Sequence, residues 1–333
     1  MEIPFKIYFL STFTAYLTEL FFLTVVYQVI KFCEIEHKVR NFISDFNKLI
    51  KLRLTMTVVF SASICFLMGS RFQGDINWFN WIILTIGGFL VTGAANGFNE
   101  IIEKDLDKLM KRTMDRPIPS GKMTTGQALV LSLVMGISGT LMLVKLNFIT
   151  GVLSVLSIFL YAFVYTPMKR KSPIAVFIGA FPGAFPPLIG YFASFNEPRI
   201  SWIPVILFLI QFVWQFPHFW AIAWVLDEDY KRAGFRLLPT TKQDKTSAII
   251  TLLSTIILVP VSLMPTVYLM PDGQAFGGNF YLVIALLAGL YFTWKAILLY
   301  KNKDVLSAKN LMYTSFIYLP LLQLTLLFDF IAK

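Results

Sequence analysis

Charged side chains are scarce in this 333-residue chain, where Asp, Glu, Lys and Arg make up 14% of the residues and hydrophobic residues 56%. A soluble domain of average composition carries about 25% charged residues. The low charge and the mean hydropathy of +0.68 exclude an ordinary soluble globular domain. They indicate a protein that lies in the lipid bilayer along most of its length.

Cysteine and histidine are also rare, with two residues of each. Cys33 and Cys65 form neither a metal-binding spacing nor a disulfide framework. The net charge of +10 comes mostly from Lys and Arg in short loops between apolar runs. This distribution is typical of membrane topology, so we expect no nucleic-acid partner.

Long apolar runs fill most of the chain. A hydrocarbon core of about 30 Å needs about 20 apolar helical residues to cross it. Runs of this length predict an all-α polytopic bundle of nine transmembrane helices. They cover residues 54–70, 79–99, 125–144, 147–166, 174–194, 202–225, 247–269, 280–299 and 309–330. Gly and Pro crowd residues 179–190, which predicts either a broken or bent helix lining a cavity, or simply close helix packing.

The chain is interpreted as an N-terminal hydrophobic extension, residues 1–41, followed by one domain, residues 42–333. The apolar stretch 5–32 in the extension is a candidate for one further helix, although it contains Lys6 and Glu19. It lacks the basic start and small-residue cleavage site of a signal peptide. We therefore expect neither a signal peptide nor a transit peptide here.

Basic residues are distributed unevenly between the two sets of loops. One alternating set is rich in Lys and Arg, whereas the opposite set holds only Arg71, Lys145 and Arg199. Basic loops stay on the cytoplasmic side of a membrane. The rich face is therefore predicted to be cytoplasmic, in a bacterial inner membrane, with the C-terminus outside.

A cluster of acids marks the end of the second run. Asn99, Glu103 and Asp107 are spaced four apart, so they share one helix face over about 12 Å. Acids at membrane depth cost roughly 2.5–3.5 kcal/mol each and usually mark function. Such oxygen ligands suit Mg²⁺ bridged to a diphosphate. The alternative is a helix end whose acids pair with the nearby lysines, Lys104, Lys108 and Lys111.

A second polar cluster follows the sixth run. Asp227, Glu228 and Asp229 lie where this run ends, on the same face as the first cluster, so the two could converge on the same metals. A solvated loop start is the alternative. The predicted metal ligands are Asn99, Glu103, Asp107, Glu228 and Asp229. The predicted catalytic residues are Asn99, Glu103, Asp107 and Asp229.

Basic residues near both clusters are candidates for diphosphate binding, because guanidinium forks fit phosphate oxygens. They are Arg112, Arg116, Lys169, Arg170 and Arg232. For the pair after the fourth run, Lys169 and Arg170, the topology bias alone is a sufficient explanation.

His218 stands among aromatic residues in the sixth run. With Trp214 and Trp220 it could form a flat cleft that holds a porphyrin and ligates its iron. A packed, hydrogen-bonded histidine is the alternative.

With these motifs in hand, the chain from about residue 43 onward resembles the intramembrane UbiA-type prenyltransferase superfamily, and within it the branch that farnesylates haem. The resemblance is carried by Asn-x₃-Glu-x₃-Asp with the following Met-x-Arg-Thr-x-x-Arg-Pro, by Tyr165–Arg170, by Gly179–Tyr191 and by Trp214–Pro239. In the second acidic motif only Asp229 has a firm counterpart, and the first 40 residues have none.

The resemblance implies nine helices around a central cavity, with Mg²⁺ as cofactor. It implies that a farnesyl group passes from farnesyl diphosphate to a vinyl group of haem B. The product is haem O with its hydroxyethylfarnesyl side chain, so haem is a substrate. A haem A synthase downstream is a further implied partner. A sister enzyme acting on an aromatic quinone precursor is the nearest alternative, and an ion-coupled transporter is the alternative from another class.

Overall fold

The structure is a computed structural model of the chain that describes residues 36, 38–197, 201–270 and 272–331. The chain divides into two compact units, Met1–Asn47 and Lys48–Lys333. In the first unit, residues 38–47 are helical. The candidate helix at 5–32 lies outside the described residues, and the domain boundary after residue 41 stays a prediction.

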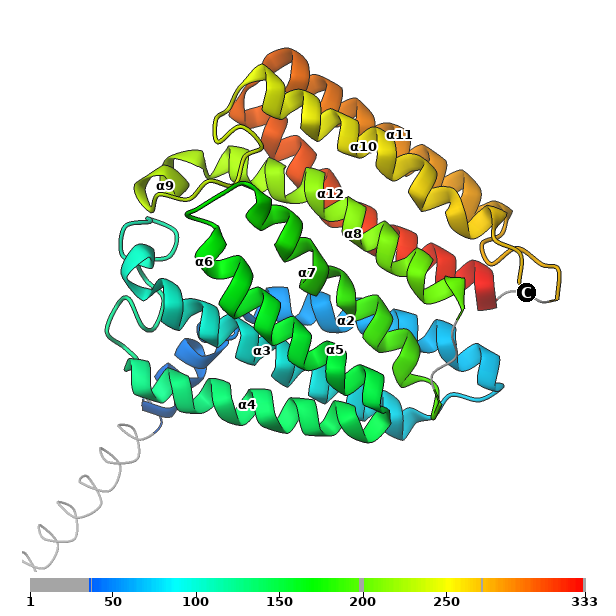
Figure 1. The fold of residues 1–333 in the computed structure, drawn as a ribbon, viewed down its shortest axis with the longest axis horizontal. Coiled ribbons are helices and arrows are strands. Elements are labelled where there is room, and N and C mark those ends of the chain that lie inside the picture. Colours follow the sequence, from blue (N-terminus) through cyan, green and yellow to red (C-terminus); the bar gives the residue numbers. More distant parts are fainter. Residues whose placement is uncertain (1–35, 37, 198–200, 271, 332–333) are drawn as a thin grey trace, which may run out of the picture. The chain divides into compact units, whose positions relative to one another are not determined.

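Nine helices in the described part of the second unit are long and apolar enough to cross a bilayer (Figure 1). They are α2 (Leu52–Ser70, continued by η1, Arg71–Gln73), α3 (Trp78–Asp107), α4 (Thr125–Leu146), the joined α5 (Phe148–Ile158), η2 (Phe159–Tyr165) and α6 (Thr166–Met168), α7 (Ile174–Ala193), α8 (Trp202–Val225), α10 (Lys245–Val267), α11 (Asn279–Asn302) and α12 (Val305–Ile331). The short α9 (Asp227–Arg232) follows α8. The described residues contain no strand, only one isolated bridge, so the predicted all-α class and nine-helix bundle are confirmed. The central cavity stays a prediction.

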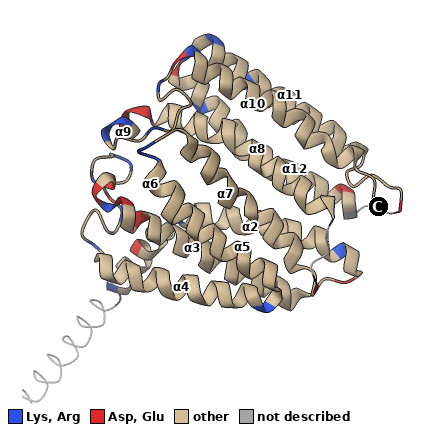
Figure 2. Cartoon of the chain, in the orientation of Figure 1, with Lys and Arg blue, Asp and Glu red and all other residues tan. Residues whose placement is uncertain are grey.

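The outward faces of the helices are apolar. On α4, Leu133, Ile137 and Leu141 lie one turn apart and are 44%, 59% and 59% exposed. Large apolar groups exposed in such a row would be unfavourable in water but are at home in hydrocarbon. Charged residues instead gather at one end of the bundle, on α9 and around the loops beside α6 (Figure 2).

Glycines allow the helix backbones to approach closely. A side chain at Gly139 of α4 would place its Cβ 2.8 Å from the Gly87 oxygen of α3. A Cβ at Gly190 of α7 would collide with the backbone of Ala62 in α2. Small residues perform this role in membrane proteins because packing, rather than water exclusion, holds the helices together.

Of the alternatives for the Gly- and Pro-rich run, a broken helix is excluded, because α7 is one continuous helix from Ile174 to Ala193. Pro187 has no N–H to donate to the Gly183 oxygen one turn earlier. Gln211 Nε2 of α8 donates to that oxygen instead, at 2.7 Å. Its Oε1 accepts from Ser61 Oγ of α2 at 2.8 Å and from Gln323 Nε2 of α12 at 3.1 Å, so one amide satisfies the freed backbone oxygen and ties four helices together.

The irregular helix lies elsewhere, between α5 and α6. Residues Phe159–Tyr165 form a π-helical segment, which the sequence pattern did not predict. Short π segments inside α-helices are frequent at functional sites. Here the segment leads directly into Thr166, whose hydroxyl meets the acidic face of α3.

Candidate active site

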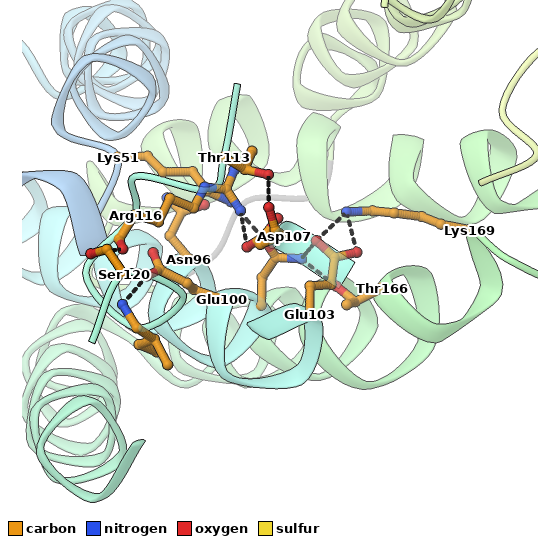
Figure 3. Close-up of polar contacts among 12 residues, drawn as sticks. Lys51, Asn96, Glu100, Glu103, Asp107, Thr113, Arg116, Ser120, Thr166 and Lys169 are labelled. Carbon is orange, nitrogen blue, oxygen red and sulfur yellow. Dashed lines mark hydrogen bonds and ion pairs between the residues drawn. The ribbon is translucent and has the colours of Figure 1, made fainter. Parts of the chain in front are cut away.

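The acidic face of α3 is buried at the charged end of the bundle. Helix α3 continues eight residues beyond the predicted limit at residue 99 and ends at Asp107. Asn99, Glu103 and Asp107 are 1%, 3% and 0% exposed. The Asn99 amide donates to Glu103 Oε2 at 3.0 Å and to Thr166 Oγ1 at 2.9 Å, which fixes the orientation of both acceptors (Figure 3).

Each of these three side chains is matched by a cation from another segment. Lys169 Nζ lies 2.9 Å from Glu103 Oε1, and Arg116 Nη1 lies 2.6 Å from Asp107 Oδ2. Lys51 Nζ donates to Asn99 Oδ1 at 2.6 Å. The structure therefore brings together the predicted acids and two of the predicted diphosphate-binding cations.

The lysines on the helix itself do not account for the acids. Lys108 pairs with Asp105 at 3.0 Å, and both side chains are largely exposed. Lys104 and Lys111 form no ion pair among the described residues. The acidic face is thus a site built from several segments, not a helix end neutralised by its own neighbours.

Burial and neighbouring charges shift the pKa values of Lys51 and Lys169 in opposite directions. Burial lowers the pKa of Lys51 well below its usual value, and the nearby positive charges of Arg116 and Lys169 lower it further. Burial also opposes the charge of Lys169, but the carboxylate of Glu103 outweighs it, so the pKa of Lys169 is raised. Lys169 is thus held as the cation that balances Glu103, whereas the charge of Lys51 is disfavoured.

The second acidic cluster reaches the first through the loop after α3. The Asp229 carboxylate accepts from the backbone N–H groups of Lys111 and Arg112, at 3.3 and 3.4 Å. The N–H of Arg236 donates to the Lys169 oxygen at 2.7 Å. These bonds tie the segment around α9 to both sides of the α3 site.

Asp227 and Glu228, the other acids of the second cluster, form their ion pairs within α9. Asp227 pairs with Lys231 at 2.5 Å, one turn along α9. The Glu228 side chain is 92% exposed and lies 3.8 Å from Arg232, so the structure leaves it in solvent and apart from the predicted metal ligands. Arg112, Arg170 and Arg232 are exposed as well.

Glu100 is a buried acid of this region that the sequence reasoning passed over. It is 0% exposed; its Oε1 accepts from the N–H of Ile118 at 3.0 Å, while Oε2 is buried with no hydrogen-bond partner among the described residues. Its contact holds the Arg116–Ile118 segment against α3. Its position directly after Asn99 in the sequence could have identified Glu100 as a third acid of the site. The roles of Lys51 and Thr166 depend on contacts between distant segments, which no local sequence pattern predicts.

The donor chemistry of the site fits Mg²⁺. Asp107 Oδ1 is buried with no hydrogen-bond partner among the described residues. No group of three or more His, Cys, Asp or Glu side chains in the described part of the chain is arranged to hold a metal ion by itself. Mg²⁺ needs only one or two carboxylates when water and substrate phosphate supply its other ligands, which Glu103 and Asp107 can satisfy.

His218 faces Ser315 and Phe316 of α12. It is 7% exposed, and its Nδ1 lies 2.7 Å from Ser315 Oγ. Its ring stacks on Trp214, with centroids 4.4 Å apart, and meets Phe316 edge-on at 5.1 Å. Trp214 Nε1 donates to the Ser315 oxygen at 3.0 Å, so both rings are held by one residue of α12.

Trp220 lies on another side of α8. Its ring contacts Phe216 at 5.5 Å, and Phe216 stacks on Phe177 of α7 at 6.1 Å. Residues two apart on a helix differ by about 200° around its axis. The structure therefore does not bring Trp220 together with His218 and Trp214 in one cleft.

Comparison with known proteins agrees with this arrangement. Residues 58–319 match the model of the UbiA prenyltransferase family. The chain belongs to the UbiA prenyltransferase family. The resemblance seen in the sequence motifs is thus confirmed, and the chain is an integral membrane prenyltransferase.

Relatives within the UbiA family are similar over nearly their whole length. The protoheme IX farnesyltransferase of Cytophaga hutchinsonii is 46% identical over 284 residues, covering 85% of this chain and 96% of that protein. A solved digeranylgeranylglyceryl phosphate synthase has a TM-score of 0.72 at 21% identity, covering 87% of this chain and 99% of that one.

A solved UbiA homologue from Archaeoglobus fulgidus, bound to GPP and Mg²⁺, has a TM-score of 0.59 at 10% identity. The match covers 85% of this chain and 99% of that one. The two solved structures establish the shared UbiA fold.

Proposed function

We propose that this UbiA-family enzyme transfers the farnesyl group of farnesyl diphosphate to a vinyl group of haem B and so forms haem O. The observation that carries the proposal is the buried face of Asn99, Glu103 and Asp107, surrounded by basic side chains. A site of this kind suits a metal-bound diphosphate. The choice of haem as acceptor is supported by the 46% identity to a protoheme IX farnesyltransferase.

Glu103 and Asp107 would hold Mg²⁺ through their carboxylates, assisted by Asn99 and, from the α9 side, by Asp229. When bound, the metal would draw negative charge from the departing diphosphate. The archaeal homologue bound to GPP and Mg²⁺ supports this assignment. Glu228 is too exposed to contribute in the same way.

The basic side chains stabilise the diphosphate as it leaves. When the bond between C1 of the farnesyl group and the diphosphate oxygen breaks, the electron pair leaves with the diphosphate. Arg116 and Lys169, which lie beside the acids, neutralise this charge, and Arg112, Arg170 and Arg232 extend the basic surface outward. Lys169 also lies over the Tyr165 ring, 4.7 Å from its centroid, so an aromatic face adjoins the same point.

The allylic cation left behind accepts electrons from the haem vinyl group, which forms the new C–C bond. Water then adds to the resulting carbocation next to the porphyrin and loses a proton, which leaves the hydroxyethyl group. Aromatic faces such as those of Tyr161 and Tyr165 stabilise the allylic cation electrostatically. The apolar bundle keeps bulk water from quenching it first.

Haem binds on the membrane side of the acidic site in this proposal. His218 is its iron ligand, and Trp214 supports the imidazole by stacking. His218 lies seven residues, or about 10 Å along the helix axis, before the end of α8 at Val225. Because the new C–C bond forms at C1, the carbon that carries the diphosphate, the porphyrin itself, and not the farnesyl chain, must extend from His218 towards the acidic site. Trp220, on another side of α8, has no direct part in this contact.

The orientation in the membrane follows from the charge distribution. The basic end of the bundle faces the cytoplasm of a bacterial inner membrane, where water-soluble farnesyl diphosphate reaches the acids. An enzyme that oxidises haem O further, such as a haem A synthase, would take up the product.

The test is product analysis in a bacterial host that makes haem B but no haem O. Membranes with the wild-type chain should yield haem O by mass spectrometry, whereas Glu103→Gln and Asp107→Asn should reduce the yield at least about 100-fold at equal protein level. Asp105→Asn is the matched control, because Asp105 lies on the same helix but is exposed. Wild-type yield in both site variants, or prenylated quinone precursors in place of haem O, would refute the proposal.

A further inference from the structure

Ser315 of α12 is the point at which two side chains of α8 are fixed. It is 0% exposed. Its hydroxyl lies 2.7 Å from His218 Nδ1, and its backbone oxygen accepts from Trp214 Nε1 at 3.0 Å. Its hydroxyl also donates to the Met312 oxygen at 2.6 Å, one turn earlier on α12.

These contacts determine which imidazole nitrogen carries the proton. A serine hydroxyl has a single hydrogen, and a backbone oxygen can only accept. Both contacts of the Ser315 hydroxyl can be hydrogen bonds at the same time only if it donates to Met312 and accepts from His218, which makes Nδ1 the protonated nitrogen. In the neutral ring Nε2 then carries the lone pair, and no described residue hydrogen-bonds to it.

We propose that Ser315 is a positioning residue that fixes His218 in the Nδ1–H tautomer and thereby presents Nε2 to the haem iron. The inference rests on the proposed function, because it requires haem as substrate. An iron ligand needs an unprotonated nitrogen, and the hydrogen bond of the other nitrogen sets both the tautomer and the direction of the ring. Stacking on Trp214 and the edge contact with Phe316 fix the ring plane in the same way.

The expected change in haem affinity is taken from other metal-ligating histidines that lose a hydrogen-bond partner. Loss of the hydrogen-bond partner of a metal-ligating histidine costs about 10- to 100-fold in metal affinity. Ser315→Ala should therefore weaken haem binding by about that factor. Ser315→Thr keeps the hydroxyl and should retain affinity within a few-fold of wild type.

A matched control is available in Ser154 of α5. It is also 0% exposed, and its hydroxyl donates to the oxygen of Gly151, three residues earlier, at 2.7 Å. Ser154→Ala therefore removes the same kind of buried bond from a hydroxyl that makes no hydrogen bond to His218. A purely structural effect of losing a buried hydroxyl would appear in this variant as well.

The experiment is a titration of the full chain, purified in detergent, with haem, followed by its absorption spectrum. Wild type and Ser154→Ala should give the spectrum of histidine-ligated haem, His218→Ala should lose it, and Ser315→Ala should need about 10- to 100-fold more haem to reach it. Wild-type affinity in Ser315→Ala, or a ligated spectrum that survives in His218→Ala, would overturn the inference. Haem O formation in membranes is scored separately, so a failure of the inference is distinguishable from a failure of the proposed function.

Discussion

Replacing Lys169 by Met isolates the electrostatic role of the buried pair that it forms with Glu103. Lys169 Nζ lies 2.9 Å from Glu103 Oε1, and the two side chains are only 10% and 4% exposed. The Met side chain keeps most of the volume of Lys but leaves the Glu103 carboxylate without its counter-charge.

The magnitude follows from the distance and the burial. Two unit charges 2.9 Å apart attract by about 6 kcal/mol at an effective dielectric constant of about 20. Breaking a buried pair by removing one partner costs about 3–5 kcal/mol in measured cases. Because Asn99 Nδ2 still donates to Glu103 Oε2, we expect Lys169→Met to lower the free energy of unfolding by about 3 kcal/mol.

A double-variant cycle separates this effect from lost packing. Glu103→Gln combined with Lys169→Met removes both charges, so the double variant should be at least about 1 kcal/mol more stable than Lys169→Met alone. The assay is equilibrium unfolding in mixed micelles of a mild detergent and SDS, with EDTA present, followed by tryptophan fluorescence.

The control is Lys108→Met, because Lys108 forms an exposed ion pair with Asp105, which lies on α3 like Glu103. Such a pair contributes about 0–1 kcal/mol. Equal stability of Lys169→Met and the wild type, or an equal loss in the single and double variants, would refute the assignment of Lys169 as the counter-charge of Glu103.

Two further predictions concern the fold. Gln211→Leu should destabilise the bundle by about 1–2 kcal/mol in the same SDS assay. The loss should be smaller in the Pro187→Ala background, where residue 187 has an N–H to donate to the Gly183 oxygen. An identical loss in the wild-type and Pro187→Ala backgrounds would contradict the inference that the Gln211 amide replaces the missing backbone bond. Asp244 caps α10, and the bond from the Ser247 N–H lowers its pKa. A carboxyl whose pKa is lowered in the folded state stabilises the protein above its unfolded pKa of about 4, and this stabilisation is lost as the pH falls through the lower, folded value. The loss of unfolding free energy caused by Asp244→Ala at pH 7 should therefore diminish below about pH 4.

The bundle could be predicted from the sequence because membrane helices obey a length rule that each segment satisfies by itself. The acidic face of α3 was also accessible, since Asn99, Glu103 and Asp107 belong to one continuous helix with a fixed angular step. The same rule, applied to α8, would have separated Trp220 from His218, and the prediction of one cleft neglected it.

The partners of the acids could not be predicted in this way. Glu103 is paired with Lys169, which lies 66 positions further along the chain. Whether a cation of a loop meets an acid or remains in solvent depends on how two segments pack, and residue spacing carries no information about that. Arg170, the next residue, is exposed.

The proline-rich helix shows a different limit. Proline and glycine reduce the intrinsic stability of a helix in water, so their density in α7 suggested a break. In a bundle, a neighbouring side chain can satisfy the freed oxygen, as Gln211 does for Gly183, and the helix continues. The amide of Gln211 in α8 thus has a structural explanation that depends on the sequence of α7.

Charge balance connects the stability of this site with its proposed chemistry. Glu103 and Asp107 are buried acids that Lys169 and Arg116 neutralise. A bare diphosphate would add negative charge to this balanced group, and Mg²⁺ alone would add positive charge; each is costly in a buried site. Bound together they largely cancel, while the carboxylates turn to the metal and the basic side chains to the phosphate oxygens. In the proposed mechanism, the ion pairs that stabilise the free protein would supply two of the metal ligands, Glu103 and Asp107, and two of the diphosphate-binding side chains, Lys169 and Arg116.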